Sequence, residues 1–321
     1  MLTVPTPKSV YIYMSRVVVM KSSSSDPPGK LTRERYRALI EIGMKNLGGI
    51  NNSKLAMRKL IPSGKVGMKT NCLARKFNST PIALTDALAD LLTDSGIKMN
   101  DIIVWERTNW ELESAGFKIN ASSTGQRCFG TDTDGIGYSH DFFISGDVNA
   151  LVSRILTEMV DYNINVPVLK DHSVAGLSAG IKNLYGMINN PNKWHTNNCD
   201  PYAAYVASLE PIKSKNQLTV IDAVRVQYNG GPGYDSRYLE QYNGLIISDD
   251  PVAADRIGLE IVQHLRKQNN LPSLEKAERP VKYLASAEKI GLGVADISKI
   301  DLKVIMVDAH GGQGMGALFD G

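Results

Sequence analysis

The chain has 321 residues, of which 43% are hydrophobic and 21% are charged, and its formal net charge is +3. These proportions are ordinary for a folded protein, and they disfavour an intrinsically disordered chain or a membrane protein. The small net charge, without a Lys/Arg block interleaved with aromatic residues, excludes a dedicated nucleic-acid-binding protein. The length fits two average domains, or one α/β unit with two lobes.

The cysteines and the first residues bear on cofactors and compartment. Cys72, Cys128 and Cys199 lie far apart without a CxxC spacing, so we expect no iron–sulfur cluster from the chain's own cysteines. Residues 10–20 alternate like a β-strand and follow no basic segment, so neither a signal peptide nor a membrane span is predicted. A cytoplasmic location follows from this pattern, whereas a protein from which a leader had been removed would be exported.

Helix and strand patterns alternate along the chain. Apolar spacing and capping signals predict helices at residues 32–47, 54–60, 80–96, 147–161, 173–188, 250–264 and 281–290, and one that starts near residue 200. Runs of β-branched and aromatic residues predict strands at residues 10–20, 65–70, 101–105, 164–172, 218–222, 245–248 and 303–308, with a long loop at 122–137. The alternation predicts an α/β fold with a mixed, mostly parallel sheet and helices on both faces, as one unit or as two lobes that meet near 150–165.

The most informative stretch covers residues 164–188. An apolar strand ends in Lys170 and His172, and a helix rich in small residues is predicted to follow at once. Because the first amides and the dipole of a helix favour negative charge, this junction is a candidate site for an anion. Lys182 and Asn183 on that helix point about 100° apart, so we expect only one of them to face a given ligand.

Polar side chains also end two other predicted strands. Lys69 and Asn71 come at the end of the strand at 65–70, and Asp222 ends the strand at 218–222. The carboxyl ends of parallel strands meet at one edge of a sheet, where ligands bind in open α/β folds. We therefore expect these side chains to join Lys170 and His172 in one polar site.

A divalent metal ion is an alternative occupant of this site. The candidate ligands are His172, His195, Asp222, Asp250 and Asp255. No HxH, HExxH or DxD spacing connects them, and Asp250, which precedes Pro251, is better explained as a helix N-cap. The identity of such a metal is left open.

The segment VPVLKDHSVAGLSAGIKNLYGMI closely resembles the hallmark of the family called domain of unknown function 362 (DUF362). In that family a proline-lysine-x-histidine segment precedes a helix that ends in Lys-Asn-x-x-Gly, represented here by Pro167, Lys170, His172, Lys182, Asn183 and Gly186. The flanking segments GKVGMKTN, TVIDAV, NGGPG and SDDPVAADRIG are similar as well. The resemblance covers about residues 16–307 and implies a single α/β unit. It also implies a redox-associated context, although the ferredoxin-like cysteine clusters of many members are missing.

These residues predict a site for an anionic small molecule or a metal ion. Lys69, Lys170 and Lys182 would neutralise the ligand, and Asn71, Asn183 and His172 would orient it. Asp222 is a further candidate for ligand binding. Lys170 and His172 are the candidates for catalysis, the histidine as general acid or base. The expected partners are the ligand, further copies of the chain and a redox protein. The alternative is a non-catalytic structural or assembly protein that forms a homo-oligomer, in which these polar groups join loops at the sheet edge.

Residues 309–321 form a glycine-rich tail with few apolar side chains. Ordering a backbone costs roughly 1–2 kcal/mol per residue, so something must hold this segment if it is ordered. We expect the tail to pack along a neighbouring subunit or against the polar site, with Phe319 as its anchor.

Overall fold

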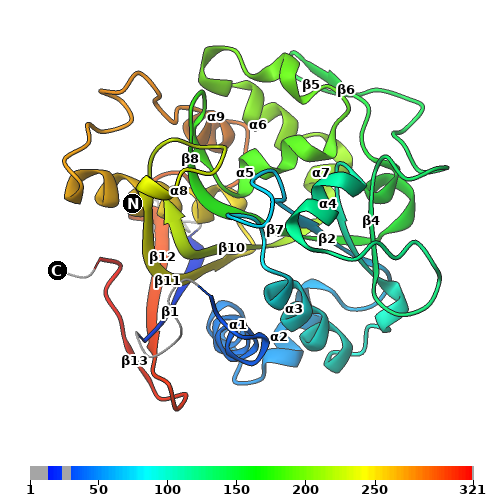
Figure 1. The fold of residues 1–321 in the computed structure, drawn as a ribbon, viewed down its shortest axis with the longest axis horizontal. Coiled ribbons are helices and arrows are strands. Elements are labelled where there is room, and N and C mark those ends of the chain that lie inside the picture. Colours follow the sequence, from blue (N-terminus) through cyan, green and yellow to red (C-terminus); the bar gives the residue numbers. More distant parts are fainter. Residues whose placement is uncertain (1–13, 24–29, 320–321) are drawn as a thin grey trace, which may run out of the picture.

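A mixed sheet runs through the middle of the molecule, and helices cover both of its faces (Figure 1). The computed structural model describes residues 14–23 and 30–319, and within these ranges the sheet has 11 strands. Its main row, from one edge to the other, is β13 (Gln313–Met315), β12 (Ile300–Val307), β1 (Ser15–Ser22), β11 (Leu239–Ser248), β10 (Asn216–Gln227), β7 (Tyr162–Val166), β2 (Val66–Thr70), β3 (Ile102–Glu106) and β4 (Arg127–Gly130).

Pairing is parallel along the half of the sheet that contains β10, β7, β2, β3 and β4. β1 and β12 are also parallel, whereas β11 is antiparallel to both of its neighbours. β8 (Val168–His172) continues beyond β7, pairs in parallel with β10 and forms an antiparallel hairpin with β9 (Gly176–Ser178). The expected α/β fold with a mixed, mostly parallel sheet is confirmed.

The helices divide between two hydrophobic clusters, one on each face of the sheet. The first cluster includes side chains of α5 (Gly180–Asn183), α6 (Tyr202–Ala207), α7 (Glu210–Lys215), α8 (Pro251–Gln268) and α9 (Tyr283–Lys289). The second includes side chains of α1 (Arg33–Gly48), α2 (Ser53–Leu60), α3 (Ile82–Asp94) and α4 (Asn109–Ala115). Short helical turns are η1 (Met99–Asp101), η2 (Ile155–Met159), η3 (Leu184–Met187), η4 (Pro191–Trp194), η5 (Asn197–Cys199), η6 (Ser236–Tyr238) and η7 (Ile297–Lys299). No helix in the described ranges is long and apolar enough to cross a bilayer.

Two of the predicted helix starts are confirmed by their caps. The Thr32 side chain accepts a hydrogen bond from the Arg35 amide, and Asp250 accepts hydrogen bonds from the amides of Val252 and Ala253. The helix predicted to start at residue 80 is not capped by Thr80, whose hydroxyl donates to the carbonyl oxygen of Val166 at 2.6 Å. The residue before α3 is Pro81, which provides no side-chain cap.

The helix predicted at residues 147–161 is wrong. Val148 and Ala150 are buried on either side of exposed Asn149, a two-residue period that suits a strand, and β6 (Val148–Ala150) pairs with β5 (Phe143–Ser145). Only the turn η2 is helical in this region. The predicted loop at 122–137 also contains strand β4. The predicted first strand begins at Ser15, and residues 10–13 lie outside the described ranges.

The central stretch also differs from its prediction. No long helix follows His172; the chain turns through residues 173–175 and returns as β9, whose first residue, Gly176, has a φ of 76°. Helix α5 covers only Gly180–Asn183, and its first amides are held by a side chain of α8. Val174, Leu177 and Ile181 are three or four residues apart, a spacing that predicts a helix, but Val174 lies in the turn, Leu177 in β9 and Ile181 in α5.

Candidate functional site

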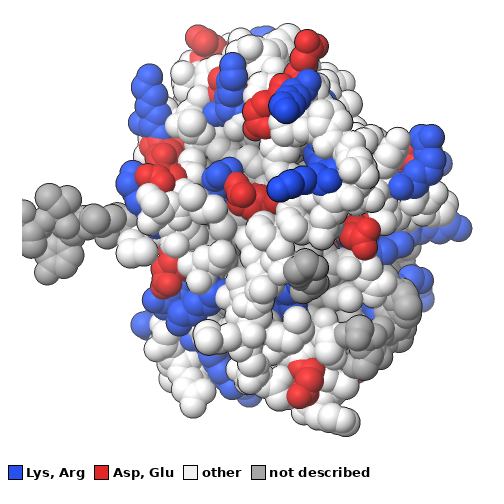
Figure 2. Space-filling view, turned by 90° about the vertical axis from the view of Figure 1, so that its left-hand side faces the viewer, with Lys and Arg blue, Asp and Glu red and all other residues white. Residues whose placement is uncertain are grey.

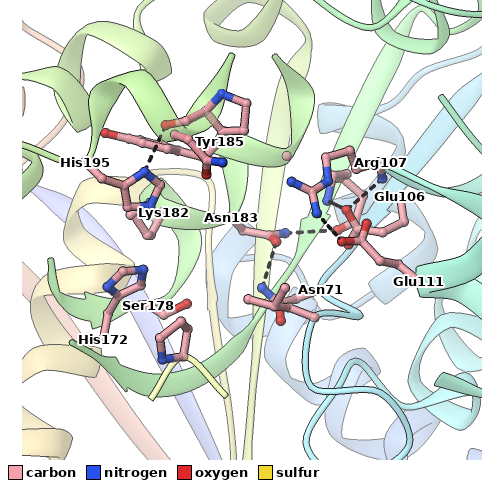
Figure 3. Close-up of a pocket in the computed structure, with 16 residues that line it drawn as sticks. Asn71, Glu106, Arg107, Glu111, His172, Ser178, Lys182, Asn183, Tyr185 and His195 are labelled. Carbon is pink, nitrogen blue, oxygen red and sulfur yellow. Dashed lines mark hydrogen bonds and ion pairs between the residues drawn. The ribbon is translucent and has the colours of Figure 1, made fainter. Parts of the chain in front are cut away.

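A polar cavity of about 390 Å³ opens where β2, β3 and β8 end (Figure 3). Its walls include Lys69, Asn71, Glu106, Arg107, Glu111, His172, Ser178, Lys182, Asn183, Tyr185 and His195. In the close-up, the two histidines, Lys182 and Tyr185 lie on one side and the two glutamates with Arg107 on the other, with the asparagines between them. The cavity therefore has one wall of cationic and aromatic groups and a second wall with carboxylates.

A chain of side-chain amides forms the floor between these walls. Lys170 Nζ donates to Asn71 Oδ1 at 3.0 Å, and Asn71 Nδ2 donates to Asn183 Oδ1 at 3.1 Å. Asn183 Nδ2 then donates to Asn165 Oδ1 at 2.8 Å, and Asn165 Nδ2 to the carbonyl oxygen of Gly180 at 2.8 Å. Every donor in this chain points away from the ammonium group. The chain fixes the orientation of each amide and joins the end of β2 to α5.

Lys69 and Glu106 form a buried ion pair at the ends of β2 and β3. Lys69 is 1% exposed and also donates to the carbonyl oxygen of Thr70 at 2.7 Å. Glu106 further accepts the amides of Cys72 and Arg107. Burial raises the pKa of Glu106, while the adjacent ammonium group opposes that shift. The charge of Lys69 is thus already compensated within the protein.

A second carboxylate beside this pair has an unused oxygen. Arg107 Nη2 contacts Glu111 Oε1 at 2.5 Å. Glu111 is buried, and its Oε2 atom has no hydrogen-bond partner among the described residues. A buried carboxylate oxygen without a partner is costly, so this atom can accept a hydrogen bond from a molecule in the cavity.

Lys182 occupies the opposite wall. Its Nζ lies 2.9 Å from His195 Nε2 and 3.4 Å from the centre of the Tyr185 ring. His195 Nδ1 lies 2.9 Å from the carbonyl oxygen of Pro191, so this nitrogen carries the proton and Nε2 accepts from the ammonium group. Burial and the adjacent Lys182 lower the pKa of His195.

His172 is neutral, and its tautomer is set by backbone amides. Nδ1 accepts hydrogen bonds from the amides of Val174 at 3.0 Å and Ala175 at 3.1 Å. Burial, with Lys182 as the next cause, lowers the pKa of His172 to about 2. The ring proton therefore lies on Nε2, which is a hydrogen-bond donor. These contacts do not favour the general acid or base role expected for His172, since neither ring nitrogen is free to accept a proton.

The cavity is flanked by two buried ammonium groups that lack a carboxylate partner among the described residues: those of Lys170 and Lys182. Burial lowers the pKa of each to about 8. At pH 7 a group with this pKa is about nine-tenths protonated. Both side chains are therefore mostly charged at neutral pH. Neither forms an ion pair within the described ranges, although Glu106 and Asp171 oppose the lowering of the Lys170 pKa.

The structure brings together all but one of the ligand-binding and catalytic residues predicted from the sequence. Lys69, Asn71, His172, Lys182 and Asn183 line the cavity, as does His195, and Lys170 lies behind Asn71. Lys182 and Asn183 both line it, and the expectation that only one of them faces a given ligand stays a prediction. Glu106, Arg107 and Glu111 were missed, although Glu106 directly follows the predicted strand at 101–105.

Asp222 is not part of this cavity. Side chains alternate along β10, and Asp222 lies on the same face as Val220 and Val224, which pack in the cluster that contains α1 and α3. Lys69 lies on the opposite face of β2 from Val66 and Met68, which belong to that same cluster. Strand ends can share an edge of the sheet and still face opposite sides of it.

The contacts do not favour the metal alternative. The described ranges contain no group of three or more His, Cys, Asp or Glu side chains placed to hold a metal ion. Metal ligation by His172 Nε2 would require a proton on Nδ1, which accepts two amides instead. Asp255 accepts the amides of Gly180 and Ile181, and Asp250 caps α8, so both of these carboxylates have structural partners.

Asp171, between the two motif residues of β8, has a structural role. Its Oδ1 accepts the Gly231 amide and its Oδ2 contacts Arg279 Nη1 at 2.6 Å. This side chain therefore holds the loop after β10 and the segment before α9 against the end of β8. His172 and Asp171 point to different sides of the strand, as neighbouring residues in a strand do.

Comparison with known proteins gives a family but no activity. The sequence model of a family described as "Domain of unknown function (DUF362)" matches residues 66–260. The chain has no significant match among curated proteins. A crystal structure of a Thermotoga maritima protein, from the Northeast Structural Genomics Consortium, aligns with 13% identity and a TM-score of 0.41, and the alignment covers 75% of this chain and 60% of that one.

Proposed function

The chain belongs to the DUF362 family, whose description names no activity, and we propose from the chemistry of its main cavity that it binds an anionic small molecule there. The observation that carries this proposal is the pair of buried ammonium groups, of Lys170 and Lys182, which form no ion pair with a carboxylate of residues 14–23 or 30–319. A buried charge without a counter-charge is strongly unfavourable, and an anion beside it removes that penalty.

The ligand's negative group would lie between Lys182 and His172. The ammonium group supplies charge, and the Nε2–H of the neutral histidine supplies a directed hydrogen bond. The amide chain below would hold Lys170 in place behind them without using a carboxylate. A carboxylate, phosphate or sulfate group suits such a set of donors.

The opposite wall limits what the rest of the ligand can be. Glu111 Oε2 needs a donor, so a hydroxyl or amino group on the ligand would be favoured there over a second anionic group. We therefore propose a small molecule with an anionic end and a hydrogen-bond donor at its other end. The redox partner and the homo-oligomer expected from the sequence stay predictions.

A charge-neutral variant of Lys182 tests the proposal. Lys182→Gln should weaken the binding of sulfate, measured by isothermal titration calorimetry, by about tenfold or more, because a charge-assisted contact is lost. Removing an unpaired buried charge should leave the fold intact, which the melting temperature will check.

Lys193→Gln is the matched control. Lys193 lies in the same loop region, is exposed, and packs over Trp194 outside the cavity, so its loss changes net charge equally. Equal sulfate affinity in both variants would contradict the proposal and favour a purely structural role for these polar groups. Native mass spectrometry of the purified protein would show whether an organic anion is retained.

A further inference from the structure

Asp222, the predicted site residue that the main cavity leaves out, lines a second cavity of about 230 Å³ on the other face of the sheet. The walls come from the segment that joins β2 to α3, from the start of α3, from α1 and from β10. No residue is shared with the main cavity. A ligand in this second cavity would not depend on the function proposed above.

The charges around the second cavity are unequal. Among the described residues, four basic side chains line it, namely Lys30, Arg75, Lys76 and Arg225, against one acidic side chain, Asp222. Arg225 donates to the carbonyl oxygen of Phe77, and the guanidinium of Arg75 lies 5.2 Å from the Trp110 ring centre. Neither guanidinium forms an ion pair within the described ranges. The walls therefore present positive charge that an anion would balance.

The N-terminus of α3 adds backbone donors to the same walls. Ile82 and Ala83, the first two residues of this 13-residue helix, line the cavity, and no side chain caps them. The first amides of a helix have no partner within the helix, and its dipole favours negative charge at this end. By itself a helix start of this kind shows no ligand.

Unpartnered buried side chains point to a ligand independently. Asn78 lines the cavity and is only 4% exposed, yet its Nδ2 has no hydrogen-bond partner among the described residues. The buried hydroxyl of the adjacent Ser79, also in the wall, has none either. Most buried polar atoms of a folded protein are satisfied, so two orphaned groups in one wall require an additional partner.

Asp222 supplies a contrasting group. Its Oδ1 accepts hydrogen bonds from Tyr36 Oη at 3.2 Å and from the Val224 amide at 3.3 Å, whereas Oδ2 accepts no hydrogen bond within the described ranges.

We infer that this cavity is a second ligand site, for a small molecule that carries an anionic group at one end and a hydroxyl or ammonium group at the other. The anion would contact the α3 amides, Asn78 and the basic side chains, and the donor would reach Asp222.

The probes are phosphoethanolamine, which has both groups, and inorganic phosphate, which lacks the donor. Titration calorimetry should show tighter binding of phosphoethanolamine. The effect of Ala83→Asp is measured in the Lys182→Gln protein, in which the main cavity has lost its anion contact. There Ala83→Asp should weaken the binding of both probes by about tenfold, because its carboxylate competes with the ligand for the first amides of α3, while an acidic residue at this position stabilises the helix itself. Ala121→Asp, an identical change at an exposed position outside the cavity, should leave both affinities unchanged.

Two further variants separate this site from the main cavity. Asp222→Asn should remove the preference for phosphoethanolamine over phosphate, and Lys182→Gln should leave the Ala83-dependent binding unchanged. The inference is overturned if the protein binds neither probe, if Ala83→Asp has no effect, or if Lys182→Gln alone abolishes the binding, which would assign it to the main cavity.

Discussion

At the scale of single residues, burial changes the pKa of two lysine side chains, Lys170 and Lys182, relative to that of a lysine on the surface. Lys170 is fully buried beside an amide, and Lys182 lies against an aromatic ring and a neutral histidine. Loss of water disfavours the ammonium form, which lowers each pKa to about 8. By contrast Lys69, equally buried, has a carboxylate beside it.

This shift predicts how anion binding should depend on pH. Because the pKa of Lys182 is lowered from 10.5 to about 8, the residue is charged below pH 8 and loses its proton as the pH rises through that value. Sulfate keeps its charge over this range, so its affinity should fall between pH 7 and pH 9, as calorimetry at fixed ionic strength can measure. Lys182→Gln should lose most of this dependence, and an affinity that stayed constant in the unaltered protein would contradict the assignment.

At the scale of elements, the site depends on how a four-residue helix is held. Helix α5 is too short to be stable alone, and it carries both Lys182 and Asn183. Asp255 of α8 accepts the amides of Gly180 at 2.6 Å and Ile181 at 2.9 Å. A buried carboxylate from a distant helix thus takes the place of a local cap.

Removing this carboxylate should affect both stability and binding. Asp255→Ala leaves two buried amides unsatisfied, which should lower the free energy of unfolding by about 2–4 kcal/mol and weaken sulfate binding. Chemical denaturation measures the first effect and calorimetry the second. Glu260→Ala on the same helix breaks only a partly exposed pair with Arg256, and it should cost less than about 0.5 kcal/mol. Equal effects of the two variants would mean that Asp255 does not support α5.

At the scale of the whole molecule, the glycine-rich tail packs on the chain's own body. β13 pairs with β12 at the sheet edge, Tyr242 donates to the carbonyl oxygen of Leu318 at 2.8 Å, and the Phe319 ring stacks on His264 with centroids 4.1 Å apart. The expectation that the tail packs against the polar site is wrong, whereas contact with a neighbouring subunit stays a prediction. Residues 320–321 lie outside the described ranges.

The surface charges are also a property of the whole molecule. On the face shown in Figure 2, basic and acidic side chains are interspersed.

Deleting residues 309–321 should therefore destabilise the protein without changing its main site. Loss of the Phe319 contact and of the β13 pairing should lower the free energy of unfolding by about 1–3 kcal/mol, because β12 becomes an open edge. Sulfate affinity should be unchanged, since none of the described tail residues, 309–319, lines the cavity. Phe319→Ala should reproduce part of the loss in stability, and a tail deletion that weakened sulfate binding would contradict this placement.

The sequence by itself determined the fold class and most of the main site. Alternating periods of two and 3.6 residues indicate a layered α/β fold, and polar residues at the ends of β2 and β8 must meet if those strands are parallel. That reasoning places Lys69, Asn71, Lys170 and His172 together, as the structure does. Local patterns suffice here because strand direction and strand ends are local properties.

The tertiary structure decided what depends on contacts between distant segments. It placed Asp222 on the other face of the sheet from Lys69, because strand ends specify an edge and not a face. It also turned the predicted helix after His172 into a hairpin and held the remaining turn with Asp255, 75 residues away from Gly180. Burial lowers the pKa of Lys182 and leaves Glu111 Oε2 without a hydrogen-bond partner among the described residues. A side chain becomes buried only when several helices and strands pack around it.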